Sequence, residues 1–261
     1  MGVKTLSLLF LIFSIKGLET PESVECFNGK IFISNVGKPY PAKKDGDGFI
    51  AIFGKDKKLQ KFISNLNAPK GIAVANKKLF IADIDTVVVA NSESGKVLKK
   101  IKVKDAQFLN DVAYDGKKFV YVSDTQTNTI YRIDTETLEI SIFLKSPNLE
   151  LPNGLAFLKN GNLVVASWGE GKLFEIDINK KSIKTLAYGF SNLDGVTVLN
   201  DGTILFSDFS EGKIYSFKDG KVKELKSKVV ITSPVDINYC NGKLFVPEFL
   251  FNDVKVFKVE K

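Results

Sequence analysis

Histidine is absent from all 261 residues of the chain, and its absence excludes several kinds of active site. Ser-His-Asp and Cys-His catalysis, zinc sites built on histidine and histidine as a general base are all ruled out. Any catalysis must therefore depend on carboxylates, on lysine, or on a metal ion bound by oxygen atoms.

Arginine is almost missing as well, although the formal net charge is +7. Arg132 is the only arginine among 37 basic residues. Proteins that read nucleic acids favour arginine, because its planar guanidinium forms paired hydrogen bonds to bases and phosphates. The lysines are instead scattered over predicted turns, such as those at 55–58 and 179–181. We therefore expect no nucleic-acid partner.

Long apolar runs are lacking, apart from one short run near the N-terminus. A basic start, Met1–Lys4, precedes eleven mostly apolar residues, Thr5–Ile15, which are too few to span a bilayer. This pattern is typical of a secretory signal peptide. We predict that residues 1–17 are such a signal, cleaved after Gly17, and that the protein is periplasmic or secreted without stable membrane insertion. Two alternatives stay open: an uncleaved amphiphilic anchor, and an outer strand of the fold itself.

Cysteine is scarce, with only Cys26 and Cys240 in the chain. There is no C-x-x-C pair and no spacing typical of a zinc site. An exported protein could join the two in a disulfide. Their positions in the sequence repeat described next differ by one residue, which would direct the side chains to opposite faces of their strands. This offset favours two buried thiols over a bridge.

What the chain does contain is a short motif that recurs six times, at spacings of 48, 40, 43, 41 and 41 residues. The six copies are Pro21-Glu22-Ser23-Val24, Pro69-Lys70-Gly71-Ile72, Leu109-Asn110-Asp111-Val112, Pro152-Asn153-Gly154-Leu155, Leu193-Asp194-Gly195-Val196 and Pro234-Val235-Asp236-Ile237. Each copy begins an apolar strand that ends in a tight, usually glycine-containing turn and is followed by further strand-like segments. No segment has a sustained helical period. A repeat of 40 to 50 strand-forming residues is typical of propeller blades.

The sequence therefore predicts an all-β fold, a six-bladed β-propeller formed by residues 18–261. The sixth repeat contains only three predicted strands before the chain reaches Lys261. Blade six is then either three-stranded, or it takes Thr5–Lys16 as its outer strand. The second possibility would count against a cleaved signal.

Equivalent positions of a radial repeat converge on one axis, so the second residue of each motif should face a central channel. Four of these residues carry oxygen donors: Glu22, Asn110, Asn153 and Asp194. Two carboxylates and two amide carbonyls form a hard-oxygen set that suits a divalent cation, above all Ca²⁺. The competing interpretation is that asparagine and aspartate before glycine are simply turn residues. That interpretation explains Glu22 poorly, and it does not explain the shared register.

These motifs resemble those of the SMP-30/gluconolactonase/LRE-like superfamily of six-bladed propellers over residues 20–261. The most specific marks are Pro21-Glu22-Ser23, Leu109-Asn110-Asp111, Pro152-Asn153-Gly154-Leu155 and Leu193-Asp194-Gly195-Val196. The resemblance implies that Glu22, Asn110, Asn153 and Asp194 bind a catalytic divalent cation. It further implies hydrolysis of a lactone or related ester, with Asp194 as general base or nucleophile, and it favours an exported protein.

Other residues are predicted to lie around the site. Lys70 would place an ammonium group in the channel, where it could stabilise an oxyanion or orient the substrate, or else extend out to solvent. The loops after the second strands should open on the same face as the motif. This arrangement predicts a substrate pocket formed by Trp168, Asp124, Asp208 and Glu248.

We expect a monomer that acts on a small molecule. The alternative is a non-catalytic propeller that binds a ligand or protein and uses calcium only to stiffen its axis, since one fold hosts many functions.

Overall fold

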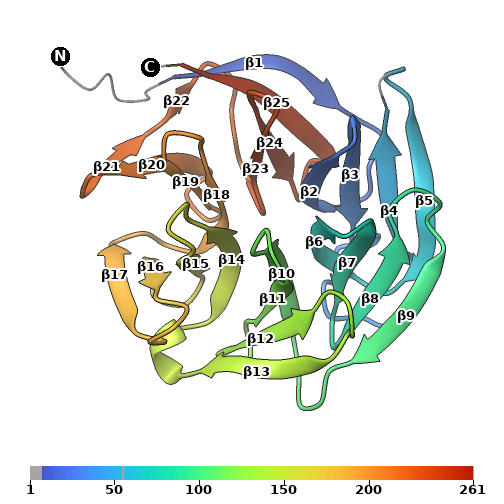
Figure 1. Ribbon diagram of the computed structural model, residues 1–261. Coiled ribbons are helices and arrows are strands. Elements are labelled where there is room, and N and C mark those ends of the chain that lie inside the picture. The colour runs from blue at the N-terminus through green and yellow to red at the C-terminus, as the bar shows by residue number, and fades with distance from the viewer. Residues whose placement is uncertain (1–7, 55, 261) are drawn as a thin grey trace.

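The structure, a computed structural model, describes residues 8–54 and 56–260 and consists of six small sheets arranged as a ring of blades (Figure 1). Among these residues all strand pairs are antiparallel except β1 with β22, which is parallel. The predicted six-bladed β-propeller is confirmed. In the described part of the chain the single helical segment is the short 3₁₀ turn η1, Pro147–Leu149. No helix in these described ranges is long and apolar enough to cross a membrane.

Five blades have four strands each, which follow one another from the centre of the ring outwards. They are β2 Pro21–Phe27, β3 Lys30–Asn35, β4 Gly48–Phe53 and β5 Leu59–Leu66; β6 Pro69–Ala75, β7 Lys78–Asp83, β8 Thr86–Asn91 and β9 Val97–Lys102; β10 Leu109–Tyr114, β11 Phe119–Asp124, β12 Thr129–Asp134 and β13 Ile140–Lys145; β14 Pro152–Phe157, β15 Leu163–Ser167, β16 Lys172–Ile176 and β17 Ile183–Ala187; and β18 Leu193–Val198, β19 Ile204–Asp208, β20 Lys213–Lys218 and β21 Lys221–Glu224.

The core lies between the blades, because neighbouring sheets pack face to face. Between the second and third blades, for example, Phe80 and Val89 meet Val112 and Val120, all of them buried. A middle strand is consequently apolar on both of its faces and reads as a nearly continuous hydrophobic run rather than an alternating one. Because the buried middle strands are hydrogen-bonded to the inner strands, they hold the inner strands and the central channel in place.

Blade six is completed by the N-terminal segment. Its sheet has the order β22 (Lys226–Ser227), β1 (Leu8–Ile15), β25 (Asp253–Glu260), β24 (Lys243–Glu248) and β23 (Asn238–Cys240). The segment β1 runs antiparallel to β25, from Leu8 opposite Glu260 to Ile15 opposite Val254. Figure 1 shows this strand, in blue, lying along the red C-terminal strand.

The apolar run therefore serves as an outer strand, which is the second alternative that the sequence left open. The first seven residues of the predicted signal peptide lie outside the described residues, and cleavage after Gly17 stays a prediction. Such cleavage would remove β1 from the ring.

A disulfide joins Cys26 on β2 to Cys240 on β23, with 6.4 Å between the Cα atoms. The expectation of two free thiols is thus wrong. The cysteines do occupy opposite faces of their own strands, as the offset indicates. However, neighbouring blades pack with unlike faces together, so a side chain on one face of blade six meets a side chain on the other face of blade one. The two sulfur atoms therefore lie in the same interface. The bridge closes the ring across 214 residues, and such a cross-link stabilises a fold by about 2–4 kcal/mol.

Candidate functional site

Five of the six motifs form a β-bulge at the start of the inner strand of their blade, and the sixth, 234–237, lies just before β23. In blade three, Leu109 pairs with Asp124 while Val112 pairs with Val122, so the inner strand holds one more residue than its partner. The same shift follows Pro21, Pro69, Pro152 and Leu193. A bulge redirects the side chain of the extra residue. In these five blades it points the second residue of the motif toward the axis, so these residues are not turn residues.

Glycine in the motif is explained by the close approach of neighbouring inner strands. A Cβ atom on Gly154 would lie 2.3 Å from the backbone oxygen of Asp194, and one on Gly195 would lie 2.3 Å from the backbone nitrogen of Ile237. No side chain fits in that space. The asparagine and aspartate that precede these glycines are therefore held rigidly at the centre of the ring.

The six axial residues all line one cavity of about 340 Å³. The structure thereby brings together the whole predicted oxygen set, together with Lys70 and Val235. The four donors come from four different blades and are at least 95% buried: Glu22, Asn110, Asn153 and Asp194. The sequence located these residues correctly because the repeat places them in the same position of each blade.

Two of the carboxylate oxygen atoms in this cavity have no hydrogen-bond partner: Oε2 of Glu22 and Oδ1 of Asp194. The other oxygen of Asp194 accepts a hydrogen bond of 3.2 Å from Nδ2 of Asn153. The amide of Asn110 donates to the hydroxyl of Thr125, also at 3.2 Å. Both amide nitrogens are thus in use, which leaves the amide carbonyl oxygens as the acceptors for an incoming cation.

Burial makes this group of carboxylates costly to ionise. It raises the pKa of Asp194 to about 8, with a further contribution from the charge of Asp111. It also raises the pKa of Glu22 well above its usual value, and Asp194 is the next largest cause. Unpaired buried carboxylates are strongly destabilising unless a positive charge compensates them. A divalent cation held by the four oxygen-bearing side chains would supply that charge, so the residues present fit such an ion.

The donor set is unusual in containing only two acidic residues. Over residues 8–54 and 56–260 no group of three or more His, Cys, Asp or Glu side chains is arranged to hold a metal ion. Two of the four predicted ligands are amide side chains. The assignment of a cation site therefore rests on the unpartnered carboxylate oxygen atoms and on the convergence of the four side chains in one cavity. Calcium accepts such neutral oxygen ligands readily.

Lys70 is buried at the side of the cavity, only 2% exposed, and does not extend out to solvent. Its Nζ donates to the carbonyl oxygens of Pro41 at 2.7 Å and Ala68 at 3.2 Å. It also lies 4.3 Å from the ring centroid of Phe108. Burial lowers the pKa of Lys70 to about 8, although Glu22 acts in the opposite direction. The ammonium group is thus tied to the wall, with one of its three N–H bonds left over.

The structure corrects the placement of three predicted pocket residues. Trp168 does line the cavity. By contrast, Asp124, Asp208 and Glu248 are completely buried and do not line it. Each accepts hydrogen bonds from backbone N–H groups in the loop that leads into its own blade.

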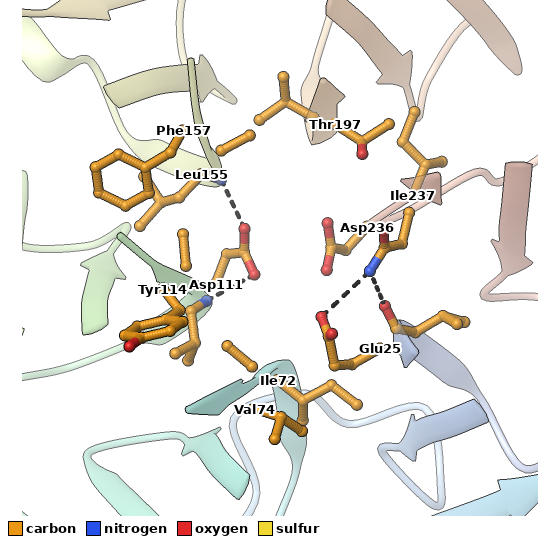
Figure 2. Close-up of a pocket in the computed structure, with 17 residues that line it drawn as sticks. Glu25, Ile72, Val74, Asp111, Tyr114, Leu155, Phe157, Thr197, Asp236 and Ile237 are labelled. Atoms are coloured by element: carbon orange, nitrogen blue, oxygen red, sulfur yellow. Dashed lines mark hydrogen bonds between the residues drawn. The ribbon is translucent and has the colours of Figure 1, made fainter. Parts of the chain in front are cut away.

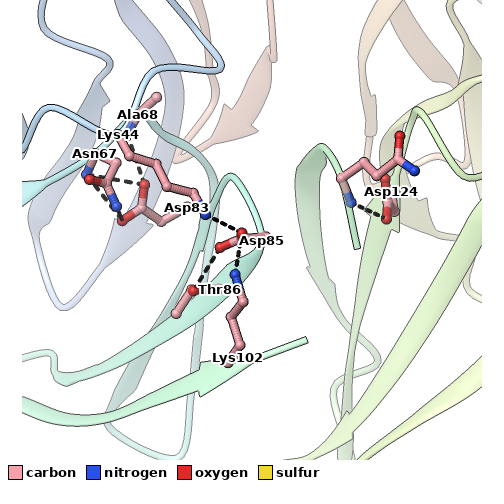
Figure 3. A network of polar contacts seen from close by, with 9 residues as sticks. Lys44, Asn67, Ala68, Asp83, Asp85, Thr86, Lys102 and Asp124 are labelled. Carbon is pink, nitrogen blue, oxygen red and sulfur yellow. Dashed lines mark hydrogen bonds and ion pairs between the residues drawn. The ribbon is translucent and has the colours of Figure 1, made fainter. Parts of the chain in front are cut away.

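For Asp124 the donors are the N–H groups of Gln107 and Phe108, both at 3.0 Å. Asp83 binds the N–H of Ala68 in the same way, and Figure 3 shows both aspartates bound to their loops. An acidic residue at the end of the second strand therefore fixes the loop before the motif. The sequence does show an acidic residue recurring at the end of the second strand. In the structure these residues anchor loops and do not line the cavity.

A second cavity of about 300 Å³ lies at the other end of the inner strands (Figure 2). Its carboxylates already have partners. Asp111 accepts hydrogen bonds of 2.6 Å from the N–H groups of Val112 and Leu155, and Asp236 accepts one from the hydroxyl of Ser23. The bond from Leu155 links blades three and four, and the bond from Ser23 links blades one and six. This end of the channel therefore has a structural function, whereas unpartnered oxygen atoms occur at the end with Asp194.

The raised pKa values give the cation-free protein a defined pH dependence. Between about pH 5 and pH 8 the folded chain keeps protons on Asp194 that the unfolded chain has lost. The free energy of unfolding must therefore fall as the pH rises. Asp85 behaves differently. Burial alone would raise its pKa, but hydrogen bonds from Lys102 and Lys44 lower it to about 2, so this carboxylate is already ionised throughout the range.

We expect the melting temperature of chelator-treated protein to be lower at pH 8 than at pH 5 by about 5 °C or more. Calcium should restore most of this loss at pH 8, because the cation takes the place of the protons. Differential scanning calorimetry at both pH values, with and without calcium, measures the effect. A melting temperature that is constant or rises over this range would contradict the assignment.

Comparison with known proteins gives a likeness in fold. No protein-family model matches the chain, and no curated protein sequence matches it. A catalytically inactive histidine-to-alanine variant of virginiamycin B lyase from Staphylococcus aureus, solved with quinupristin, has a TM-score of 0.69 at 14% identity over 98% of this chain and 99% of that one. A chain of the nidogen/laminin complex has a TM-score of 0.73 at 15% identity over 87% and 89% of the two chains.

A protein of unknown function from Bacteroides thetaiotaomicron has a TM-score of 0.74 at 16% identity, over 97% of this chain and 72% of that one. At these identities the likeness concerns the fold alone. The resemblance to the gluconolactonase superfamily stays a prediction. The chain is a six-bladed β-propeller with structural neighbours of the streptogramin B lyase kind.

Proposed function

We propose that the protein is a divalent-cation-dependent hydrolase of a lactone or related ester, with calcium as the cation. The observation that carries this proposal is the pair of buried, unpartnered carboxylate oxygens of Glu22 and Asp194 on the floor of a cavity large enough for a small molecule. Glu22, Asn110, Asn153 and Asp194 would hold the ion. When bound, it would act as a Lewis acid on the substrate carbonyl.

The chain's own residues would supply the remaining steps. Oδ1 of Asp194, which has no partner, would bind the cation, and Oδ2 would accept the proton of the attacking water. Asn153 donates to Oδ2 and so fixes the orientation of the carboxylate. The remaining N–H bond of Lys70 could stabilise negative charge on the substrate. The apolar wall would exclude water from the reacting groups.

Lyase chemistry like that of the virginiamycin B lyase neighbour has less support. Its inactive variant differs by loss of one histidine, and this chain has no histidine at all. A non-catalytic binding propeller with a structural cation is the second candidate. It is favoured by one observation: the ammonium of Lys70 is engaged by two backbone carbonyls rather than directed at the cavity floor.

The test is a hydrolysis assay with a panel of lactones and aryl esters. Chelation should reduce turnover by at least about 10³-fold, and added calcium should restore it, because loss of the cation removes several kcal/mol of transition-state stabilisation. Circular dichroism must show that the chelated protein is still folded. If no lactone or ester is turned over, or if a folded, chelated protein is fully active, the hydrolase proposal fails and the binding propeller is favoured.

A further inference from the structure

The wall of the axial cavity carries a row of aromatic rings above the polar floor. Trp168, Phe209 and Phe249 lie on the loops that follow β15, β19 and β24. The centroids of Trp168 and Phe209 are 5.5 Å apart, and those of Phe209 and Phe249 are 6.4 Å apart. All three side chains are half-buried and line the cavity. Three adjacent blades thus contribute one continuous apolar surface.

The rest of the wall is mostly apolar too, and its charged group is already engaged. Further apolar residues complete the lining: Pro41, Phe108, Leu151 and Val235. The ammonium of Lys70 is held between two backbone carbonyls and the ring of Phe108. Above the floor, the polar side chains of the lining are those of Thr125 and Gln126, and the hydroxyl of Thr125 already donates to the carbonyl of Pro152 at 2.9 Å.

A ligand rich in hydroxyl groups would therefore find few partners on this wall. The carboxylates that could have bound sugar hydroxyls, Asp124, Asp208 and Glu248, are fully buried and bound to backbone N–H groups. Hydroxyl groups placed against aromatic rings would lose their hydrogen bonds to water without replacement. An apolar substituent in the same place would gain from burial.

We propose that this cavity takes a lactone or ester with an aryl or alkyl substituent, and that it discriminates against polyhydroxylated sugar lactones. The carbonyl end would lie at the floor formed by Glu22, Asn110, Asn153 and Asp194, and the substituent would lie on Trp168, Phe209 and Phe249. The position of the carbonyl end rests on the proposed hydrolase function. The preference for an apolar substituent rests on the wall alone.

The test uses lactams, which resemble lactones but resist hydrolysis. Gluconolactam and δ-valerolactams with propyl, hexyl or phenyl substituents are titrated into the calcium-loaded full chain. The readout is the fluorescence of Trp168, the only tryptophan in the chain, with calorimetry as an independent measure. The hexyl and phenyl lactams should bind at least about tenfold more tightly than gluconolactam, and each added methylene should raise affinity about fourfold until the cavity is filled.

Two variants locate the binding surface. Phe209→Ala should weaken binding of the phenyl lactam by about tenfold or more, and Phe249→Ala provides the same test if the first variant does not fold. The control is Phe251→Ala, since Phe251 is 57% exposed and does not line the cavity. Binding by this control should equal that of the wild type.

Gluconolactam binding as tightly as the phenyl lactam would overturn the inference, and so would equal effects of Phe209→Ala and Phe251→Ala. Turnover separates this inference from the proposed function. If the apolar lactams bind as expected but the matching lactones are not hydrolysed, the apolar pocket stands and the hydrolase proposal fails. If sugar lactones are hydrolysed and apolar ones are neither bound nor hydrolysed, the hydrolase stands and the inference fails.

Discussion

Replacement of Asp194 by asparagine is expected to lower kcat for the best lactone or ester substrate by about 10²- to 10⁴-fold, the usual contribution of a general base. Asparagine has nearly the same shape and keeps a carbonyl oxygen for the cation, but it cannot accept a proton at neutral pH. It also removes a buried carboxylate whose pKa is raised to about 8 by burial. The variant should therefore be at least as stable as the wild type.

The matched control is Asp111→Asn. Asp111 is equally buried but binds two backbone N–H groups beside the second cavity. Its replacement should affect stability more than turnover. Steady-state kinetics and thermal melts of both variants distinguish the two roles. Full activity of Asp194→Asn would show that Asp194 is neither base nor nucleophile.

Removal of residues 1–17 is expected to destabilise the fold severely, because it takes β1 out of blade six. Leu9 and Ile15 on this strand are 3% and 2% exposed and pack into two different parts of the core. Burial of such side chains contributes about 1.5–3 kcal/mol each, against a total stability of about 5–15 kcal/mol for a typical protein. Loss of the strand also leaves the outer edge of β25 unpaired, while its inner edge stays paired with β24.

We expect residues 18–261 to melt at least about 10 °C below the full chain, or not to fold at all. A chain that lacks only residues 1–7 keeps β1 and is the comparison that isolates the contribution of this strand. If residues 18–261 prove as stable as the full chain, β1 is dispensable and the predicted cleavage after Gly17 is compatible with the fold. The intact mass of the protein isolated from its natural source would show directly which form exists.

The fold and the axial residues could be predicted because both depend on a period. A repeat of about forty residues specifies blades, and identical positions in the blades meet at one axis whatever their identity. Glu22 and Asp194 could thus be placed together although 172 positions separate them in the sequence. The hairpin turns and the strands could be predicted from local sequence signals alone.

The remaining features depend on geometry that a period does not contain. An aspartate at the end of a second strand can face a pocket or bind its own loop. The sequence around Asp124 is compatible with both roles, and only the structure shows that it binds the loop. The disulfide depended on which faces of two sheets meet, so the correct inference that Cys26 and Cys240 occupy opposite faces led to the wrong conclusion. Trp168, Phe209 and Phe249 each directly follow the second strand of their blade, so the period brings them to one end of the ring, but it does not show that their rings contact one another.

The central claim is that a divalent cation binds at the axis, and calorimetric titration of calcium into the chelator-treated full chain tests it most directly. The wild type should bind calcium at a single site, with proton release at pH 7, and Asn110→Ala should weaken binding by at least about tenfold. Gln126→Ala removes an amide from the same cavity but not from the donor set, and it should bind calcium like the wild type. A folded wild type that binds no calcium, or an Asn110→Ala variant that binds it normally, would contradict the account.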